Sequence, residues 1–208
     1  QYREGFGPFA GGYRLLPFGD ADAVAAAMTD RTVAVLVEPI QGEAGIVVPP
    51  QGYLAQLRDI TTRHGALLLA DEIQSGLGRT GALFAFQHDG VRPDLVTVGK
   101  ALSGGFYPVS GILADSALMN VFKPGDHGST FGGNPLGAAV AREALKVLVE
   151  ERMIENSAKL GAYALERLRA IPSPHIREVR GRGLWIGIEL RPEAGGARRF
   201  CEQLALPR

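Results

Sequence analysis

Four short runs of largely apolar residues, separated by longer segments with other patterns, most constrain how this chain can fold. The runs are TVAVLVEP at 32–39, ALLLADE at 66–72, DLVTVG at 94–99 and VSGILAD at 109–115. Strands with one exposed face alternate apolar and polar residues, whereas continuous apolar runs are typical of strands covered on both faces. The sequence therefore predicts an α/β fold with a mainly parallel sheet flanked by helices.

Residues that favour helix ends lie between these runs. Asp20 or Asp22 is the predicted N-terminal cap of a short helix in DADAVAAAMTD, since a carboxylate accepts hydrogen bonds from free backbone amides. Gly65 is the predicted end of a helix that begins near residue 51. Asn134 is the predicted N-terminal cap of a further helix, and Pro135 is its predicted first residue.

The longer predicted helices each have one apolar face, which we expect to be buried. On the helix at 51–65, this face consists of Tyr53, Leu54, Leu57, Ile60, Thr61 and His64. On the helix after Asn134, it consists of Leu136, Val140, Ala144, Val147 and Leu148. A further helix at about 153–171 is expected to bury Ile154, Ala158, Leu165 and Leu168.

The C-terminal part of the chain predicts a second folding unit. HIREVRGRGLWIGIEL at 175–190 has the pattern of two strands around Gly181 and Gly183. We therefore expect a large, partial domain at 1–153 and the beginning of a smaller α+β domain at 154–208. The chain opens without an initiator methionine and ends at CEQLALPR within a predicted helix, so we expect a fragment or one piece of a split protein.

The composition is that of an ordinary globular protein. Of 208 residues, 46% are hydrophobic and 21% charged, and the formal net charge is zero, which gives no reason to expect nucleic acid or an acidic membrane as partner. The apolar runs are too short to span a bilayer, and the single Cys201 has no partner for an internal disulfide. A cytoplasmic enzyme or binding protein is the expectation.

The predicted strands end in polar residues, which matters because ligands of open α/β sheets bind beyond the carboxyl ends of the strands. The first run ends at Glu38, the second at Asp71 and Glu72, and the third leads to Lys100 in a glycine-rich segment. Two carboxylate ends and one amine end predict a site that handles charge.

Lys100 has three interpretations on these grounds. A solvated surface lysine needs no function. A phosphate-binding lysine needs a GxxxxGK[ST] loop, which fails here because Asp94 and Ala101 occupy the positions of the first glycine and of Ser or Thr. A Schiff-base lysine fits the apolar strand before it, where a poorly solvated amine becomes a better nucleophile.

A Schiff-base lysine that serves pyridoxal phosphate also needs a carboxylate at the pyridine nitrogen. Asp71 is the candidate, and it is equally suited to capping the turn that follows it. Other chemistries have less support, because the histidines and the cysteine lack metal-ligand spacing, GRGLWIG lacks the context of a dinucleotide loop, and no G-x-S-x-G elbow is present.

Four motifs in this order carry a specific resemblance: VEPIQGEAG, LLLADEIQSGLGRTG, VTVGKALSGG and GSTFGGNPLG. Together they resemble the class III (subgroup II) aminotransferases of the fold-type I pyridoxal-phosphate superfamily. Within that family, GFGPFAGGYRLLPFGD and the segments around the motifs are most similar to ornithine aminotransferases. The resemblance covers essentially the whole chain, which corresponds to about the middle half of the family's length.

The resemblance implies pyridoxal 5′-phosphate as cofactor and gives roles to residues that match the motifs. Lys100 would form the Schiff base and later move the proton, and Asp71 would hold the pyridine nitrogen protonated. Ile73 would pack against the ring, Gln74 would hydrogen-bond the phenolic oxygen, and Glu38 would lie nearby as a supporting acceptor.

Two further features of the resemblance concern partners. Ser129 and Thr130 would bind the phosphate of the neighbouring subunit's cofactor, which implies a homodimer with shared active sites. Glu43 matches a glutamate that pairs with a C-terminal arginine and leaves it free when a dicarboxylate binds. The implied reaction transfers the δ-amino group of L-ornithine to 2-oxoglutarate. Without the resemblance, Glu43 would be interpreted as a solvated carboxylate in a loop.

Alternatives stay open at this point. An acetylornithine or other ω-amino-acid aminotransferase, such as one for 4-aminobutyrate, shares nearly every motif. A chain that is inactive or needs a complementary polypeptide fits the unusual ends, and mutase or decarboxylase chemistry would keep the fold. Arg79, Arg180 and Arg182 receive no role in the site, since the last two are equally suited to solvent or to holding domains together.

Overall fold

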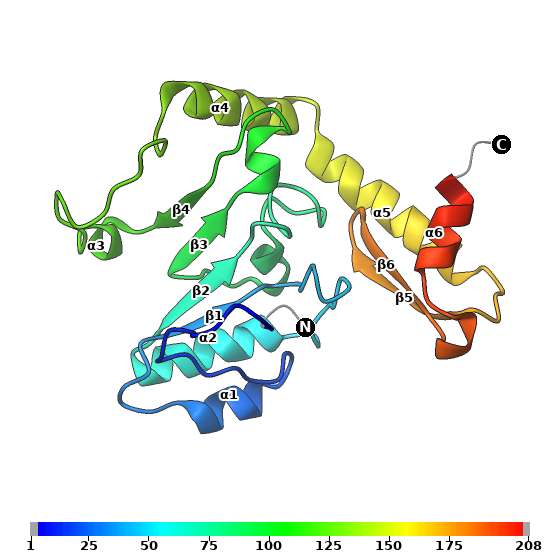
Figure 1. Cartoon of the computed structure of the whole chain (residues 1–208), viewed down its shortest axis with the longest axis horizontal. Coiled ribbons are helices and arrows are strands. Elements are labelled where there is room, and N and C mark those ends of the chain that lie inside the picture. Colours follow the sequence, from blue (N-terminus) through cyan, green and yellow to red (C-terminus); the bar gives the residue numbers. More distant parts are fainter. Residues whose placement is uncertain (1–3, 206–208) are drawn as a thin grey trace.

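The computed structural model describes residues 4–205, whose strands form two separate sheets (Figure 1). The first sheet has the order β1 (Ala34–Val37), β2 (Leu67–Asp71), β3 (Leu95–Val98) and β4 (Gly111–Ala114). β1, β2 and β3 run parallel, and β4 pairs antiparallel with β3. The prediction of a mainly parallel α/β sheet is confirmed.

β4 differs from the expected buried strand. It lies at the edge of the sheet, and Ile112 and Leu113 are 43% and 50% exposed. Residues 99–110, which include a 3₁₀ helix, return the chain beside β3 in the opposite direction, which gives an antiparallel edge strand with a neighbour on one side. Its apolar residues predicted a strand, but they did not predict what covers it.

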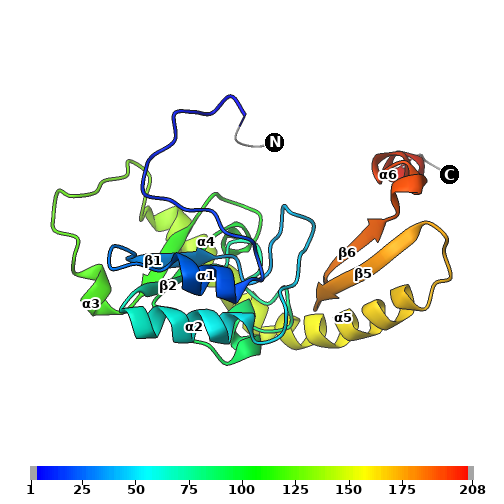
Figure 2. The same ribbon diagram turned by 90° about the horizontal axis from the view of Figure 1, so that it is seen from below.

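The main core lies between the sheet and α2 (Tyr53–His64). Figure 2 shows α2 running along one side of β1 and β2, with α1 (Ala21–Ala27) beside it. The buried members of this core are Val24, Val37, Tyr53, Leu54, Leu57, Ile60, Leu68 and Val91. Since alternate residues of a strand face opposite sides, Leu36 of β1 points away from this core and is 63% exposed.

The predicted helix ends are confirmed. The Asp20 carboxylate accepts a hydrogen bond from the backbone amide of Ala23 at 2.8 Å and caps α1. Gly65 ends α2 in the left-handed conformation, with φ of 64°. Asn134 caps α4 (Pro135–Glu150), and Pro135 is its first residue.

The predicted buried faces are only partly correct. The face of α2 is buried except for His64, which is exposed. On α4, Leu136 is 58% exposed, and on α5 (Met153–Arg169) Ala158 is exposed although Leu165 is buried. α4 lies at the rim of the sheet, where it contacts the 3₁₀ helix at 100–103 and α5, so much of its apolar face has no covering element among residues 4–205.

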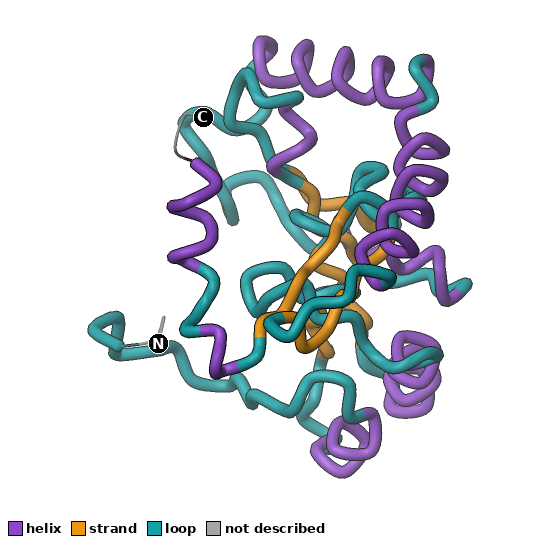
Figure 3. The backbone as a smooth tube through the Cα atoms, turned by 90° about the vertical axis from the view of Figure 1, so that its right-hand side faces the viewer, coloured by secondary structure: helices purple, strands orange, loops and turns teal. Residues whose placement is uncertain are grey.

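The chain turns sharply between α4 and α5 (Figure 3). Arg152, the residue before α5, is in the left-handed region with φ of 52°. Beyond α5, β5 (Ile176–Arg182) and β6 (Trp185–Leu190) are the two predicted strands, they pair antiparallel, and β5 packs on α5. The division at residues 153 and 154 stays a prediction.

The remaining elements are short helices. They are α3 (Ser116–Met119), α6 (Arg198–Ala205) and the 3₁₀ helices Ala85–Asp89, Lys100–Ser103 and Pro192–Ala194. Within residues 4–205, no helix combines the length and the apolar character that crossing a membrane requires.

The hairpin meets the first part of the chain at a junction made largely of backbone. Gly161 of α5 lies against Gly183 in the β5–β6 turn so closely that a Cβ on Gly161 would overlap the Gly183 backbone. On its other side, Gly183 lies against the backbone of Thr80. The Ser157 hydroxyl donates to the carbonyl of Arg79 at 2.8 Å across the same junction. Glycine is required here because two backbones approach each other directly.

Candidate active site

The candidate site lies where the parallel strands β1, β2 and β3 end. Glu38 follows β1, Asp71 is the last residue of β2, and Lys100 follows β3 after Gly99. The register places Asp71 beside Thr97 on the neighbouring strand. Because the three strands are parallel, their carboxyl ends lie at one edge of the sheet, and the structure brings these side chains to that edge.

Asp71 is held through one of its two carboxylate oxygens. Oδ1 accepts a hydrogen bond from the backbone amide of Ile73 and one from the Thr97 hydroxyl, each at 3.0 Å. Among residues 4–205, no group donates to Oδ2. Asp71 therefore caps the following turn with Oδ1 and has no described donor at Oδ2, so the capping interpretation is compatible with the predicted cofactor role.

Thr97 was not selected from the sequence. It is a threonine inside an apolar strand, and only the pairing of β2 with β3 makes it a neighbour of Asp71. A polar residue in the middle of DLVTVG was the available signal, because a buried hydroxyl needs a partner.

Lys100 is the first residue of a 3₁₀ helix and has a positive φ of 42°. Within the described part of the chain, its amine has no hydrogen bond or ion pair. The expectation of a poorly solvated amine is wrong for this structure, because the side chain is exposed. Strand β3 buries Val96 and Val98, but the chain leaves the sheet at Gly99 and presents Lys100 to the outside.

Ile73 lies next to this strand end. A Cβ placed on Gly99 would be 3.6 Å from two side-chain carbons of Ile73. The Ile73 side chain is therefore close to the backbone that carries Lys100. Its predicted packing against a cofactor ring is compatible with this position and stays a prediction.

Glu38, Glu43 and Gln74 form a second cluster. The Glu38 carboxylate accepts from the backbone amide of Gly42 at 2.9 Å and so closes the turn that carries Glu43. Gln74 Nε2 donates to Glu43 Oε1 at 3.0 Å, and the Gln74 amide lies against Gly42. The structure thus brings together Glu38, Glu43 and Gln74, which were all selected from the sequence. Glu43 and Gln74 bond to each other here, whereas the resemblance implies an arginine as the partner of Glu43 and a cofactor oxygen as that of Gln74.

Ser129 and Thr130 lie apart from this cluster. They belong to the exposed segment between α3 and α4, which projects from the sheet in Figure 1. The Ser129 hydroxyl accepts a hydrogen bond from the Gly132 amide at 2.9 Å within that segment. The structure does not bring these two residues to Asp71 and Lys100 of the same chain.

Glu72 is a buried carboxylate next to the site. It is 1% exposed, accepts from the Ser75 hydroxyl at 2.6 Å and accepts from the Phe86 amide at 2.9 Å. Burial raises the pKa of Glu72 above its ordinary value, while the bond from Ser75 acts in the opposite direction. The sequence indicated its place at a strand end but not its function, which is to join the 72–76 turn to the segment at 85–89.

Residues 4–205 contain no group of three or more His, Cys, Asp or Glu side chains that could hold a metal ion. Two of the titratable groups at the strand ends are Lys100, whose amine has no partner among these residues, and Asp71, whose Oδ2 accepts no hydrogen bond from them. This pair suits an organic ligand with an electrophilic carbon and a basic ring nitrogen.

Comparisons with known proteins agree on one family. Residues 1–205 match the family Aminotransferase class-III. The ornithine aminotransferase of Bordetella pertussis is 58% identical over 202 residues, which are 97% of this chain and 49% of that protein. The chain therefore spans about half the length of the curated relatives that it matches.

Two solved structures show the same relationship. An ornithine aminotransferase from Toxoplasma gondii, described with partial occupancy of PLP at its active site, has a TM-score of 0.90 and 45% identity over 92% of this chain and 46% of its own. An acetylornithine aminotransferase from Elizabethkingia anophelis has a TM-score of 0.85 and 44% identity over 89% of this chain and 50% of its own. Class-III aminotransferases use pyridoxal phosphate, and this chain belongs to the class-III aminotransferase family.

Proposed function

We propose that the protein that carries this chain is an ornithine aminotransferase. It would transfer the δ-amino group of L-ornithine to 2-oxoglutarate and give L-glutamate 5-semialdehyde and L-glutamate. The observation that carries the proposal is the Glu43–Gln74 contact at 3.0 Å beside the strand ends. A carboxylate at this place favours a substrate with a cationic end and disfavours a second carboxylate, unless a cation pairs with it.

The residues present fit pyridoxal phosphate as the cofactor. When bound, this group supplies an aldehyde carbon that forms Schiff bases with amines and a ring that accepts electrons from the substrate carbon. Lys100 offers an amine that no described residue neutralises. Asp71 offers Oδ2, while Oδ1 is fixed by Ile73 and Thr97, so the carboxylate is oriented before any ligand arrives.

Each residue then has a defined task in the proposed reaction. Lys100 Nζ would hold the cofactor and, once released, take a proton from the substrate carbon and return it. Asp71 Oδ2 would accept the hydrogen of the pyridine nitrogen, and its negative charge would keep that nitrogen protonated. Ile73 would pack on the ring, Gln74 would donate to the phenolic oxygen, and Glu38 would support the turn at Gly42.

A homodimer is part of the proposal. Ser129 and Thr130 would bind the phosphate of the partner's cofactor, which agrees with their exposed position away from the strand ends. Large exposed apolar side chains in the same region and on α4 support an interface there. They are Phe106, Val121, Phe122, Phe131, Leu136, Leu145 and Val149. The cytoplasmic location and the division into domains at 1–153 and 154–208 remain proposals as well.

A second candidate function is an acetylornithine aminotransferase. The Elizabethkingia anophelis enzyme, with 44% identity, favours it. N-acetylornithine keeps the δ-amino group but lacks the free α-ammonium, so a carboxylate at Glu43 distinguishes the two substrates by charge. Glu43→Gln is expected to lower kcat/KM for ornithine by about tenfold and to change that for N-acetylornithine less.

The proposal is tested by spectroscopy and then by turnover. Adding pyridoxal phosphate to the purified protein should give the visible absorption band of a Schiff base, which should be lost in Lys100→Ala and kept in Lys159→Ala. Lys159 is a matched control because it is an exposed lysine of α5. Turnover is then compared for ornithine, N-acetylornithine and 4-aminobutyrate.

Two outcomes would overturn the proposal. No turnover of unblocked ornithine excludes an ornithine aminotransferase. No band, or a band that Lys100→Ala retains, favours a chain that is inactive or that needs a complementary polypeptide.

A further inference from the structure

Residues 41–47, here called the Glu43 loop, connect β1 to the segment before α2 and carry Glu43. The loop is closed by an antiparallel bridge between Gln41 and Val47. Within it, the amides of Gly45 and Ile46 both donate to the Gly42 carbonyl, at 2.9 and 3.1 Å. The loop therefore has a defined backbone, although Glu43, Ala44 and Gly45 are exposed.

The backbone of this loop is strained at one position. Ile46 has a φ of 56°, in the left-handed region that L-residues with a branched Cβ very rarely adopt. Such a conformation persists only where the surroundings hold it. None of the hydrogen bonds inside the loop is accepted by the Gly45 or Ile46 carbonyl, so a donor from outside the loop can hold both.

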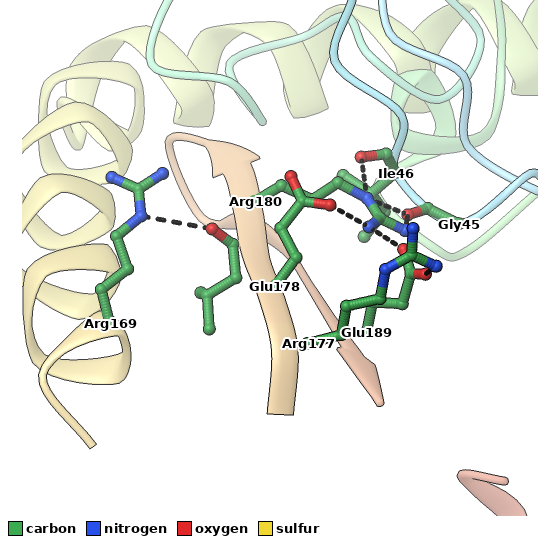
Figure 4. A network of polar contacts seen from close by, with 8 residues as sticks. Gly45, Ile46, Arg169, Arg177, Glu178, Arg180 and Glu189 are labelled. Atoms are coloured by element: carbon green, nitrogen blue, oxygen red, sulfur yellow. Dashed lines mark hydrogen bonds and ion pairs between the residues drawn. The ribbon is translucent and has the colours of Figure 1, made fainter. Parts of the chain in front are cut away.

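Arg180 of β5 provides this contact (Figure 4). Its Nε donates to the carbonyl of Gly45 at 3.0 Å and to that of Ile46 at 3.2 Å, and its Nη2 donates to Gly45 at 2.8 Å. A guanidinium presents several donors in one rigid plane, so it can hold two consecutive carbonyls at once. The residues that it joins are 134 and 135 positions apart in the chain.

Two carboxylates orient this guanidinium. Arg180 Nη1 donates to Glu178 at 2.8 Å and also to Glu189, which Arg177 contacts from the other side at 2.7 Å. The hydrogen bond with Glu189 raises the pKa of Arg180 and holds the pKa of the Glu189 carboxyl below its ordinary value. The Arg180 side chain is 17% exposed, so it is largely shielded from solvent.

Strand β6, which pairs with β5, also lies against the Glu43 loop. Gly187 of β6 pairs with Arg180 in the hairpin register. A Cβ on Gly187 would lie 3.1 Å from the Gly45 carbonyl oxygen and 3.4 Å from the Ile46 Cβ. The first of these distances is shorter than nine in ten contacts of a Cβ in proteins, so the loop occupies part of the space that a side chain at Gly187 would need.

We propose that Arg180 and Gly187 form a seat on the β5–β6 hairpin that fixes the Glu43 loop and thereby positions the Glu43 carboxylate against Gln74. Arg180 is thus a positioning residue for substrate selection. The part of this inference that concerns substrates rests on the proposed function, whereas the part that concerns the loop does not. It also assigns the hairpin a contribution to the site at the ends of the sheet strands.

The first test measures amide hydrogen exchange in the Glu43 loop. Arg180→Gln should accelerate exchange of the Gly45, Ile46 and Val47 amides by about tenfold or more, because bonds from a charged donor are lost. Arg177→Gln is the matched control, since Arg177 shares Glu189 but makes no contact with the loop. Unchanged exchange rates in Arg180→Gln, or an equal acceleration in Arg177→Gln, would contradict the proposal that Arg180 fixes the loop.

A second variant covers the case in which Arg180→Gln does not fold. Gly187→Ala keeps the guanidinium and displaces the Gly45 carbonyl from the other strand. It should accelerate exchange of the same three amides, with the unfolding midpoint measured separately to exclude a global loss of stability. A Gly187→Ala protein with the exchange rates of the unchanged chain would contradict the proposal.

The third measurement concerns substrates. In Arg180→Gln, the ratio of KM for ornithine to KM for 2-oxoglutarate should change by about fivefold or more with a smaller effect on kcat, and Arg180→Lys should restore part of it. An equal change of both KM values would contradict a role in selection. If the unchanged protein does not use ornithine, the proposed function fails while the exchange measurement still decides on the seat.

Discussion

Gly161→Ala gives a decisive test of the junction between α5 and the hairpin, because two effects predict opposite signs. In the interior of a helix, alanine is more favourable than glycine by about 1 kcal/mol, so helix propensity alone predicts a more stable protein. The structure predicts the reverse. The added Cβ would lie closer than 3.0 Å to three backbone atoms of Gly183, where ordinary contacts begin at 3.4 Å.

The overlap is not relieved by a small movement. Gly183 itself lies against the backbone of Thr80, so the turn has no free space behind it. Overpacking of this kind costs about 1–3 kcal/mol, and a clash between backbones belongs at the upper end. Subtracting the gain in helix propensity leaves a net loss of about 2 kcal/mol, which corresponds to a fall in Tm of about 4–8 °C.

Urea unfolding followed by circular dichroism measures this difference. Ala162→Gly is the matched control, because it is the next residue of the same helix, is exposed, and reports the propensity effect alone, with an expected loss of about 1 kcal/mol. A Gly161→Ala protein that is more stable than the unchanged chain would refute the close approach of the two backbones.

Three further changes test other parts of the fold. Asp20→Ala removes the cap of α1 and should lower the free energy of unfolding by about 1 kcal/mol in urea titration. Asp94→Ala removes an acceptor of the Leu68 amide at 2.7 Å and of Arg58 at 2.8 Å, so a loss of about 2 kcal/mol is expected, and an unchanged midpoint would contradict it. Burial raises the pKa of Glu72 above its ordinary value, so the stability present at low pH is lost as the pH rises through the raised pKa. Glu72→Gln should flatten this dependence of unfolding free energy on pH, and equal slopes in both proteins would exclude the effect.

The features that the sequence predicted well depend on neighbours along the chain. The helix termini lie where the sequence predicted them, because capping involves amides and carbonyls within a few residues. Asp20, Asn134 and Pro135 lie at helix starts, and Gly65 lies at a helix end. The apolar runs predicted the strands of the sheet for a similar reason.

The features that were missed depend on what lies beside a segment in space. The apolar spacing of α4 predicted a buried Leu136, but periodicity does not say which element covers a face. Thr97 became part of the site only through strand pairing, and Arg180 only through a contact with residues more than 130 positions away. The solvent exposure of Lys100 likewise follows from where the chain leaves the sheet, since the residues around it in the sequence are apolar.

At position 100, the backbone conformation favours glycine, whereas the proposed chemistry requires a lysine. A φ of 42° costs an L-residue with a Cβ about 1–2 kcal/mol, whereas glycine adopts it without steric hindrance. A library of variants screened for thermal resistance alone would therefore enrich glycine at position 100. Under the role proposed for Lys100, a screen for turnover would eliminate the same variants, because glycine has no side-chain amine. Directed evolution of this protein thus needs both screens, and this residue is where they disagree.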